Sequence, residues 1–372
     1  MFGQSLRFGK ILGIPLGVNY SWFIIFVLIT LSLTTQFRSD HPQWSLIEHI
    51  MFGVSTSVLF FGSVLLHELG HSVMALRFGI PVQAITLFVF GGVAQIGREP
   101  DKPSHEFAIA VAGPVVSALL GLFFYGLMIA SRGVFLGFAD LSAWLGRINI
   151  VLAVFNLVPG FPLDGGRILR SAVWRSTGSF ERATRTAAGS GQLFAYAFVL
   201  WGIWQAFNGD FFNGLWIGFI GWFLLNAAQA ANAQVTAKTS LHGVTAAEVM
   251  TQDYLAVPPS TTVAELVHDH LLRTGARSSM VTEGTTFLGL VTLHEIKKIP
   301  HETWRSTPLR EIMVPEQQLL AVTPDTSLDI VLQRMNEENI SQMPVTARGQ
   351  LVGVIGRDRL LALLQTRLEL KM

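Results

Sequence analysis

Two histidines and a glutamate fall within the short segment His67-Glu68-Leu69-Gly70-His71. In a helix, His67 and His71 lie one turn apart on the same face, where two neutral imidazoles can share one tetrahedral zinc ion. Glu68 follows the first histidine directly, and a carboxylate at that position can take a proton from a water that zinc has activated. The spacing therefore predicts a hydrolytic zinc site, with His67 and His71 as ligands and Glu68 as general base.

The apolar surroundings of this segment argue against a purely structural role. In that alternative, the histidines of a buried helix bond to backbone groups and Glu68 pairs with a cation. Residues 47–76 form an apolar run long enough to cross a bilayer. Each charged group at mid-bilayer costs about 2.5 to 3.5 kcal/mol, so a cluster of ionisable residues there indicates function.

A candidate third ligand, Asp164, lies in residues 156–167. A catalytic zinc generally has three protein ligands and an open position for water. Pro159 and Pro162 interrupt the preceding apolar run and leave Asp164 at the start of the next helical turn, on the same membrane side as the histidines. In the alternative, Asp164 only caps a helix that begins near Gly165. The chain contains no cysteine, so zinc must use nitrogen and oxygen ligands.

Composition predicts a polytopic α-helical membrane protein. The chain has 372 residues, of which 50% are hydrophobic and 14% charged, and its mean hydropathy is +0.46. About six transmembrane helices can be drawn, at residues 18–35, 47–76, 105–130, 141–158, 187–207 and 212–232. Charges become frequent near Ala237, which predicts a membrane domain over residues 1–236 and a soluble domain over 237–372.

Basic residues predict the orientation of this chain in a cell membrane. In the six-helix arrangement, only Arg38 and Arg132 fall on one side, and most of the other basic residues of the membrane domain fall on the opposite side. The side rich in lysine and arginine is cytoplasmic, which places both termini and the soluble domain inside. Arg7 and Lys10 resemble the start of a signal peptide, but we expect a retained first transmembrane helix. The net charge of +1 gives no indication of nucleic-acid binding.

Three further residues are candidates for substrate contact. Residues 80–96 alternate short β-prone runs around Gly91 and Gly92 and are predicted to form a β-hairpin or re-entrant sheet beside the site. Its strand edge could pair with an unwound substrate segment, or the segment could be a loop whose glycines only turn the chain. Asn156 could stabilise a developing oxyanion or bond to backbone groups freed by Pro159.

The soluble domain contains an internal duplication with a period of about 64 residues. Glu248-Val249-Met250 recurs as Glu311-Ile312-Met313, and Gly289-Leu290-Val291 recurs as Gly353-Val354-Ile355. Each copy, over residues 244–300 and 307–367, is predicted to contain a strand, a helix, two strands and a second helix.

The two signatures in the apolar part of the chain resemble those of the site-2 protease family of intramembrane zinc metalloproteases. That family combines H-E-x-x-H with a later segment that contains Asn and Pro and ends in Leu-Asp-Gly, here residues 156–165. The resemblance implies one zinc ion bound by His67, His71 and Asp164, with Glu68 as base. It also implies a single-span membrane protein as substrate, such as an anti-sigma factor or a membrane-bound transcription regulator.

The duplicated segment resembles a pair of CBS domains, which implies a soluble α/β module. Such pairs often bind ATP or another adenine nucleotide through a Thr or Ser after the second strand and an Asp three residues later. Thr292 and Glu295 occupy these positions in the first copy, and Asp358 lies one residue from the acidic position in the second. In the alternative, the module only forms a homodimer or docks substrate tails.

A different class of function also combines a membrane domain with CBS domains, namely a CBS-regulated transporter or channel. Such a protein should present paired broken helices near the bilayer midplane. Here the ionisable residues instead gather at one end, in the spacing of a peptidase. A catalytically silent scaffold is the other alternative, but Glu68 is present.

Overall fold

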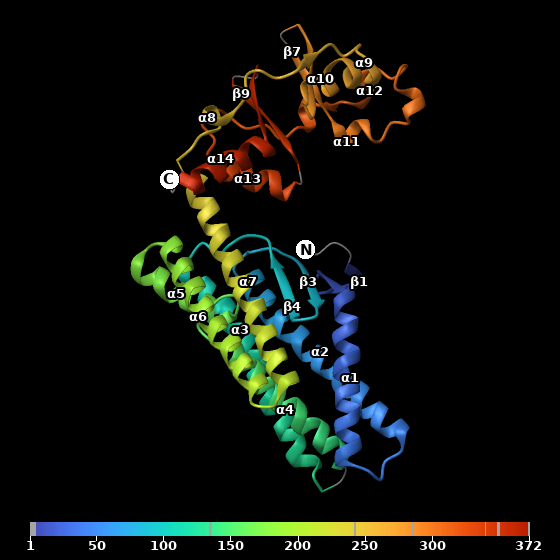
Figure 1. Ribbon diagram of the computed structural model, residues 1–372, viewed down its shortest axis with the longest axis vertical. Helices are drawn as coiled ribbons and strands as arrows, with labels where there is room; N and C mark the ends of the chain where they lie inside the picture. Colours follow the sequence, from blue (N-terminus) through green and yellow to red (C-terminus); the bar gives the residue numbers. More distant parts are fainter. Residues whose placement is uncertain are drawn as a thin grey trace. The chain divides into compact units, whose positions relative to one another are not determined.

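The computed structural model describes residues 5–133, 136–241, 243–284, 286–338, 340–347 and 350–370. The chain divides into two compact units, with the boundary between Val235 and Thr236 (Figure 1). The first unit consists of long helices and one sheet, and the second consists of short helices and strands. This mostly helical architecture with a C-terminal α/β module confirms the predicted fold class.

Among the described residues, the first unit contains α1 (Tyr20–Asp40), α2 (Leu46–Arg77), α3 (Pro103–Ser131), α4 (Leu136–Asn156), α5 (Asp164–Thr177), α6 (Phe180–Phe207) and most of α7 (Phe211–Leu241). Five are long and apolar enough to cross a membrane, namely α1 to α4 and the part of α7 over Phe211–Ala233. Helix α6 contains the predicted span 187–207 but is not among these five. Its crossing of the membrane stays a prediction.

A capping box starts helix α2, which carries the site, and small or polar residues pack it against its neighbours. Ser45 and Glu48 form a capping box at the start of α2, in which the Ser45 backbone N–H donates to the Glu48 carboxylate over 2.6 Å. Small residues let α1 approach α2, because a Cβ at Gly53 would lie 2.3 Å from the Thr34 hydroxyl. Asn149 of α4 donates to the Ser63 hydroxyl of α2 over 3.2 Å. Polar contacts and small residues thus fix α2 between its neighbours.

A four-stranded sheet belongs to the same unit, with the order β1 (Ser5–Ile11), β2 (Ile14–Asn19), β3 (Val82–Phe88) and β4 (Gly91–Ile96) (Figure 1). Strands β3 and β4 are antiparallel, with Ile85 opposite Ala94, which confirms the predicted hairpin. Helix α1 matches the predicted first transmembrane helix at residues 18–35. Residues 5–19 before it form a second hairpin, which the sequence analysis did not predict. Strand β2 pairs in parallel with β3, with Leu16 opposite Ile85. This pairing between distant segments leaves no local signature in the sequence.

The second unit contains both copies of the repeat. The first copy has α8 (Ala246–Val249), β5 (Ala256–Val257), α9 (Val263–Glu265), a π-helical turn (Leu266–Leu271), α10 (Leu272–Thr274), β6 (Ser278–Glu283), β7 (Thr286–Thr292) and α11 (Leu293–Ile296). A 3-10 turn (His301–Thr303) connects it to the second copy. That copy has α12 (Leu309–Ile312), β8 (Val314–Pro315), a 3-10 turn (Glu316–Gln318), α13 (Leu328–Glu337), β9 (Gln342–Ala347), β10 (Gln350–Gly356) and α14 (Arg357–Leu370).

Equivalent pairings in the two copies confirm the duplication. Leu290 of β7 pairs with Val314, and Val354 of β10 forms the equivalent bridge with Thr251. The unit has two main buried cores, one around Leu266 and one around Leu328, and each includes a short helix from the other copy, with Leu309 of α12 in the first core and Ala246 of α8 in the second. Met280, Phe287 and Leu290 pack with Val354 and join the two copies. The apolar faces of the strands thus bury one another within a single module.

Candidate metal centre

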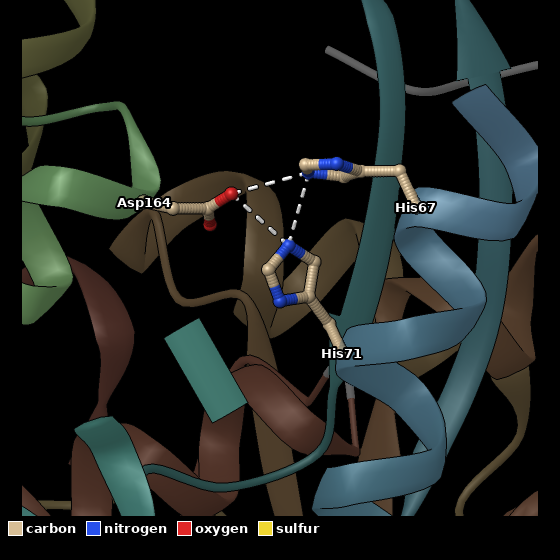
Figure 2. A group of neighbouring side chains, drawn as sticks. All are labelled: His67, His71 and Asp164. Carbon is tan, nitrogen blue, oxygen red and sulfur yellow. Dashed lines mark hydrogen bonds and ion pairs between the residues drawn. The ribbon is translucent and has the colours of Figure 1, made fainter. Parts of the chain in front are cut away.

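Helix α2 directs His67 and His71 into the interior of the first unit. The two residues are one turn apart, and each is only 4% exposed. Their Nε2 atoms lie 3.2 Å from each other (Figure 2). The helix predicted from the H-E-x-x-H spacing therefore forms and brings both imidazoles to one point.

Asp164 completes the cluster from a different helix. Its Oδ2 lies 3.1 Å from the Nε2 of His67 and 3.1 Å from the Nε2 of His71 (Figure 2). Helix α5 begins at Asp164, and its cap residue is Leu163, which makes no side-chain cap bond. The structure thus directs the Asp164 carboxylate to the histidines and gives it no part in capping a helix at Gly165.

Two glycines after Asp164 make this placement possible. Residues 157–163 fold back over the first turn of α5, so a Cβ at Gly165 would lie 2.3 Å from the Val158 carbonyl oxygen. A Cβ at Gly166 would lie 2.4 Å from the carbonyl carbon of Gly160. No real Cβ atom approaches backbone this closely, so the Leu-Asp-Gly-Gly sequence is required for this close packing of loop and helix.

The three side chains fit a zinc ion. Two ligand atoms about 2.0 Å from zinc at a tetrahedral angle lie about 3.3 Å apart, and the three observed separations of 3.1, 3.1 and 3.2 Å are within about 0.2 Å of that value. Among the described residues, these three form the group of side chains that could hold a metal. Neutral imidazole nitrogens with one carboxylate oxygen are a donor set that zinc prefers.

Hydrogen bonds on the far side of each imidazole prepare the cluster for a cation. The Nδ1 of His71 lies 2.7 Å from the carbonyl oxygen of Ile109, which can only accept, so Nδ1 carries the proton and Nε2 presents a lone pair in the neutral ring. The Nδ1 of His67 lies 2.9 Å from the Ser117 hydroxyl. The cluster therefore offers an anionic oxygen beside imidazole lone pairs.

The Ala112-Gly113-Pro114 motif of α3 has a role that sequence reasoning missed. A Cβ at Gly113 would lie 2.3 Å from the Nε2 of His71 and 2.6 Å from the Nε2 of His67. Gly113 therefore leaves the space that the two imidazoles occupy, besides any effect on helix packing. Ser117 is one turn further along α3, a helical spacing from Gly113 that could have identified it once α3 was known to face the histidines.

Glu68 lies beside the cluster and contacts the sheet. Its Oε2 accepts a hydrogen bond of 3.0 Å from the backbone N–H of Ala94 in β4. A Cβ at Gly92 would lie 2.5 Å from the Glu68 Cγ, so the absence of a side chain at Gly92 makes room for the glutamate. Gly91 has a φ of +128°, a conformation that favours glycine, and nothing lies near its absent side chain.

Asn156 is the last residue of α4 and is half-buried. Its side chain makes no hydrogen bond with the residues that the structure describes. The alternative in which it satisfies backbone groups freed by Pro159 is thus not realised. Its amide stays free for another partner.

The predicted nucleotide contacts of the second unit do not gather at one place. The Thr292 hydroxyl and backbone N–H both bond to the Glu295 carboxylate as the capping box of α11. Asp358 instead lines a cavity of about 260 Å³, where it is joined by Arg277 and Arg359. Thr292 and Glu295 do not line this cavity.

Comparison with known proteins identifies both parts of the chain. The model of peptidase family M50 matches residues 55–134 and 127–200, and the CBS domain model matches residues 246–302 and 309–366. A protein of Synechocystis that is assigned as a zinc metalloprotease is 36% identical over 98% of this chain and 96% of its own length. The zinc metalloprotease MJ0392 of Methanocaldococcus jannaschii is 28% identical over 99% of both chains.

Solved structures with similarity to each unit were also found. The site-2 protease from Methanocaldococcus jannaschii has 29% sequence identity and a TM-score of 0.43, and the match covers 62% of this chain and 95% of that chain. A CBS protein solved in complex with AMP, CBSX2, has 21% identity and a TM-score of 0.30, with coverage of 35% and 100%.

Proposed function

Because this chain belongs to peptidase family M50, the site-2 protease family of zinc metalloproteases, we propose that it hydrolyses a peptide bond in or next to a transmembrane segment of a membrane protein. The observation that carries this proposal is the buried triangle of His67, His71 and Asp164. All three come from a unit with five helices that could cross a membrane. A hydrolytic centre there favours a substrate that also lies in the bilayer.

In this proposal, His67, His71 and Asp164 hold zinc and Glu68 is the general base. Bound zinc supplies Lewis acidity, which polarises a carbonyl and brings the pKa of water near 7. Glu68 takes the proton of the attacking water and returns it to the leaving amine. The Ala94 N–H orients the Glu68 carboxylate for both transfers. The free amide of Asn156 donates to the developing oxyanion.

The outer edge of β4, which pairs with no further strand among the described residues, supports a role in holding the substrate. β4 is the last strand of its sheet, and the N–H of Ala94 points off that edge toward Glu68. An extended substrate segment can add to such an edge through main-chain hydrogen bonds. Nothing lies where a side chain of Gly91 would project, which lets the segment approach closely, and the missing side chain of Gly92 leaves room for Glu68 beside it. The substrate helix must therefore unwind locally, as expected for a single-span protein such as an anti-sigma factor or a membrane-bound transcription regulator.

The distribution of charge supports an orientation with both termini and the CBS pair in the cytoplasm of the cell. The basic residues in and directly after the membrane domain that fall on the proposed inner side are Arg7, Lys10, Arg77, Arg98, Lys102, Arg167, Arg170, Arg175, Arg182, Arg185 and Lys238. His71 lies fewer than two turns from the end of α2 at Arg77. In this proposed orientation, the site lies near the cytoplasmic face, where water can reach it.

Adenine nucleotide binding by the CBS pair is a second proposed function. The cavity that contains Asp358 also presents two guanidinium groups, from Arg277 and Arg359. Arginine is suited to phosphate and a carboxylate to a ribose hydroxyl. Binding of ATP there, or a homodimer formed through the CBS pair, would regulate the protease. Calorimetric titration with ATP, ADP and AMP tests this function, and no heat with any of them would reject it.

Zinc content and cleavage measured together test the main proposal. The purified full chain is assayed for bound zinc and for cleavage of single-span substrates, beside the Glu68→Gln and Asp164→Ala variants. Glu68→Gln should keep the metal and lose cleavage. Unchanged proteolysis in that variant would reject Glu68 as the base, and full zinc affinity in Asp164→Ala would reject Asp164 as a ligand.

A further inference from the structure

Helix α3 contacts both histidines of the cluster. Ser117 bonds to His67, the Ile109 carbonyl bonds to His71, and Gly113 lies against both imidazole rings. These three residues share one face of α3 with Glu106 at the first turn of the helix. This face of α3 therefore determines the orientation of both imidazole rings.

Asp164 is on helix α5, and its side chain makes no hydrogen bond to α3 among the described residues. The loop that precedes α5 makes no side-chain cap bond at Leu163. The tight packing of this loop at Gly165 and Gly166 places the first turn of α5, and a second contact joins the helix to α3 further along. A polar contact between the packed helices α5 and α3 is the ion pair between Arg170 and Glu106.

This ion pair is deeply buried and bidentate on the arginine side. The Arg170 Nε donates to the Glu106 Oε1 over 2.6 Å, and the Arg170 Nη2 contacts the same oxygen. The side chain of Glu106 is fully buried and that of Arg170 is 10% exposed. The other carboxylate oxygen, Oε2, has no hydrogen-bond partner among the described residues. A buried carboxylate is costly without its cation, so Glu106 holds Arg170 strongly.

Aromatic rings restrict the guanidinium from two further elements. It lies 5.1 Å from the centroid of the Phe161 ring, in the loop before α5, and 4.5 Å from that of Phe180, at the start of α6. Glu99 is a second, more distant acid, at 3.9 Å from the Arg170 Nη1. Arg170 of α5 thus contacts α3, the loop before Asp164 and the start of α6.

We propose that Glu106 and Arg170 are positioning residues that hold Asp164 in register with His67 and His71. The two residues touch neither substrate nor metal and act through α5, the helix that begins at Asp164. The inference rests on the proposed metal centre. If the ion pair is lost, the Asp164 carboxylate should move and metal affinity should fall. In other metal sites, removing residues that orient the ligands has this effect.

The test compares metal binding by the full chain in detergent with and without the ion pair. Zinc affinity is measured by competition with a chelating dye, and the visible spectrum of the Co²⁺-substituted protein reports the ligand geometry. Arg170→Met should weaken zinc affinity by about 10- to 100-fold and change the cobalt bands. Arg170→Lys, which keeps the charge, should restore part of the loss.

Arg185→Met is the matched control, because it removes an arginine from an exposed ion pair with Glu181 on α6. It should leave affinity and spectrum unchanged. Glu106→Gln, which keeps the shape of the side chain, provides a second variant if Arg170→Met does not fold. Folded variants with wild-type zinc affinity and cobalt spectrum would overturn the proposal, even with a lower melting temperature. Loss of the fold in Arg170→Met, Arg170→Lys and Glu106→Gln would also overturn the proposal, because the ion pair would then stabilise the whole unit rather than position Asp164.

The same measurements separate this inference from the proposed function. A wild-type chain that binds no zinc would reject the metal centre itself. A wild-type chain that binds zinc, with unaffected variants, would reject only the positioning role.

Discussion

His71 is oriented by the backbone of a neighbouring helix, since its Nδ1 donates to the Ile109 carbonyl oxygen over 2.7 Å. This bond fixes which nitrogen faces Asp164, because a carbonyl oxygen cannot donate. His67 has a weaker restraint, since its partner is the Ser117 hydroxyl, which can rotate and can donate or accept. A side-chain substitution can therefore remove the hydrogen-bond partner of His67, but not the backbone partner of His71.

Ser117→Ala should weaken zinc affinity by about tenfold, because His67 loses the group that orients its ring. The measurement is competition with a chelating dye. Ser142→Ala on α4 is the control, since the Ser142 hydroxyl is also buried and has no hydrogen-bond partner among the described residues. Equal zinc affinity in the two variants would show that Ser117 does not orient His67.

Gly113→Ala should abolish stable zinc binding, because the new Cβ would lie within 2.6 Å of both imidazole Nε2 atoms. The rings or the helix must move, and the cluster opens. Gly126→Ala on the same helix has open space around the added carbon, and the higher helix propensity of alanine, by up to about 1 kcal/mol, should keep or raise stability. Zinc content of the two purified variants decides the matter. A full complement of zinc in Gly113→Ala would contradict the described packing.

Gly92→Ala should separate metal binding from catalysis. The added carbon would lie 2.5 Å from the Glu68 Cγ, so Glu68 must shift while the histidines and Asp164 keep their places. A shift of about 1 Å in a catalytic group costs about 100-fold in rate. We expect normal zinc content and a kcat lower by about that factor, with Gly62→Ala in an open part of α2 as control. Normal kcat in Gly92→Ala would argue against Glu68 as the base.

Removal of zinc with a chelator should stop cleavage and lower the melting temperature, and added zinc should restore both. A ligand present at about 100 times its Kd stabilises the folded state by about 2.7 kcal/mol. Glu68→Gln should keep this zinc-dependent stabilisation, whereas Asp164→Ala should lose most of it. Thermal unfolding with and without zinc measures the difference. Stabilisation of Asp164→Ala equal to that of the wild type would point to a different third ligand.

Features that depend on local sequence patterns could be predicted from the sequence. The spacing of His67 and His71 matches one helical turn, and the apolar runs match helices α1 to α4 and α7. The β-prone segment around Gly91 and Gly92 does form the β3–β4 hairpin, and the duplicated motifs lie in equivalent strands β7 and β10. In each case, the pattern reflects contacts made within one element or between elements close in sequence.

Features that depend on distant segments could not be predicted. The N-terminal hairpin was missed because β2 is stabilised by pairing with β3, far along the chain. Glu106 had no assigned role, since nothing near it in sequence indicates its partner Arg170. Ser117 and the Ile109 carbonyl carry no motif either. A hydroxyl or a carbonyl becomes an orienting group only when another helix brings an imidazole to it.

The sequence by itself determined which side chains are available for chemistry and which of them share a helix face, because helical periodicity is a local property. Only the tertiary structure decided that the Asp164 carboxylate lies 3.1 Å from both imidazoles, and that α3 orients them from behind. These arrangements depend on how α2, α3 and α5 pack. Close packing is determined by glycines such as Gly113 and Gly165, whose importance lies in the atoms that occupy the space beside them.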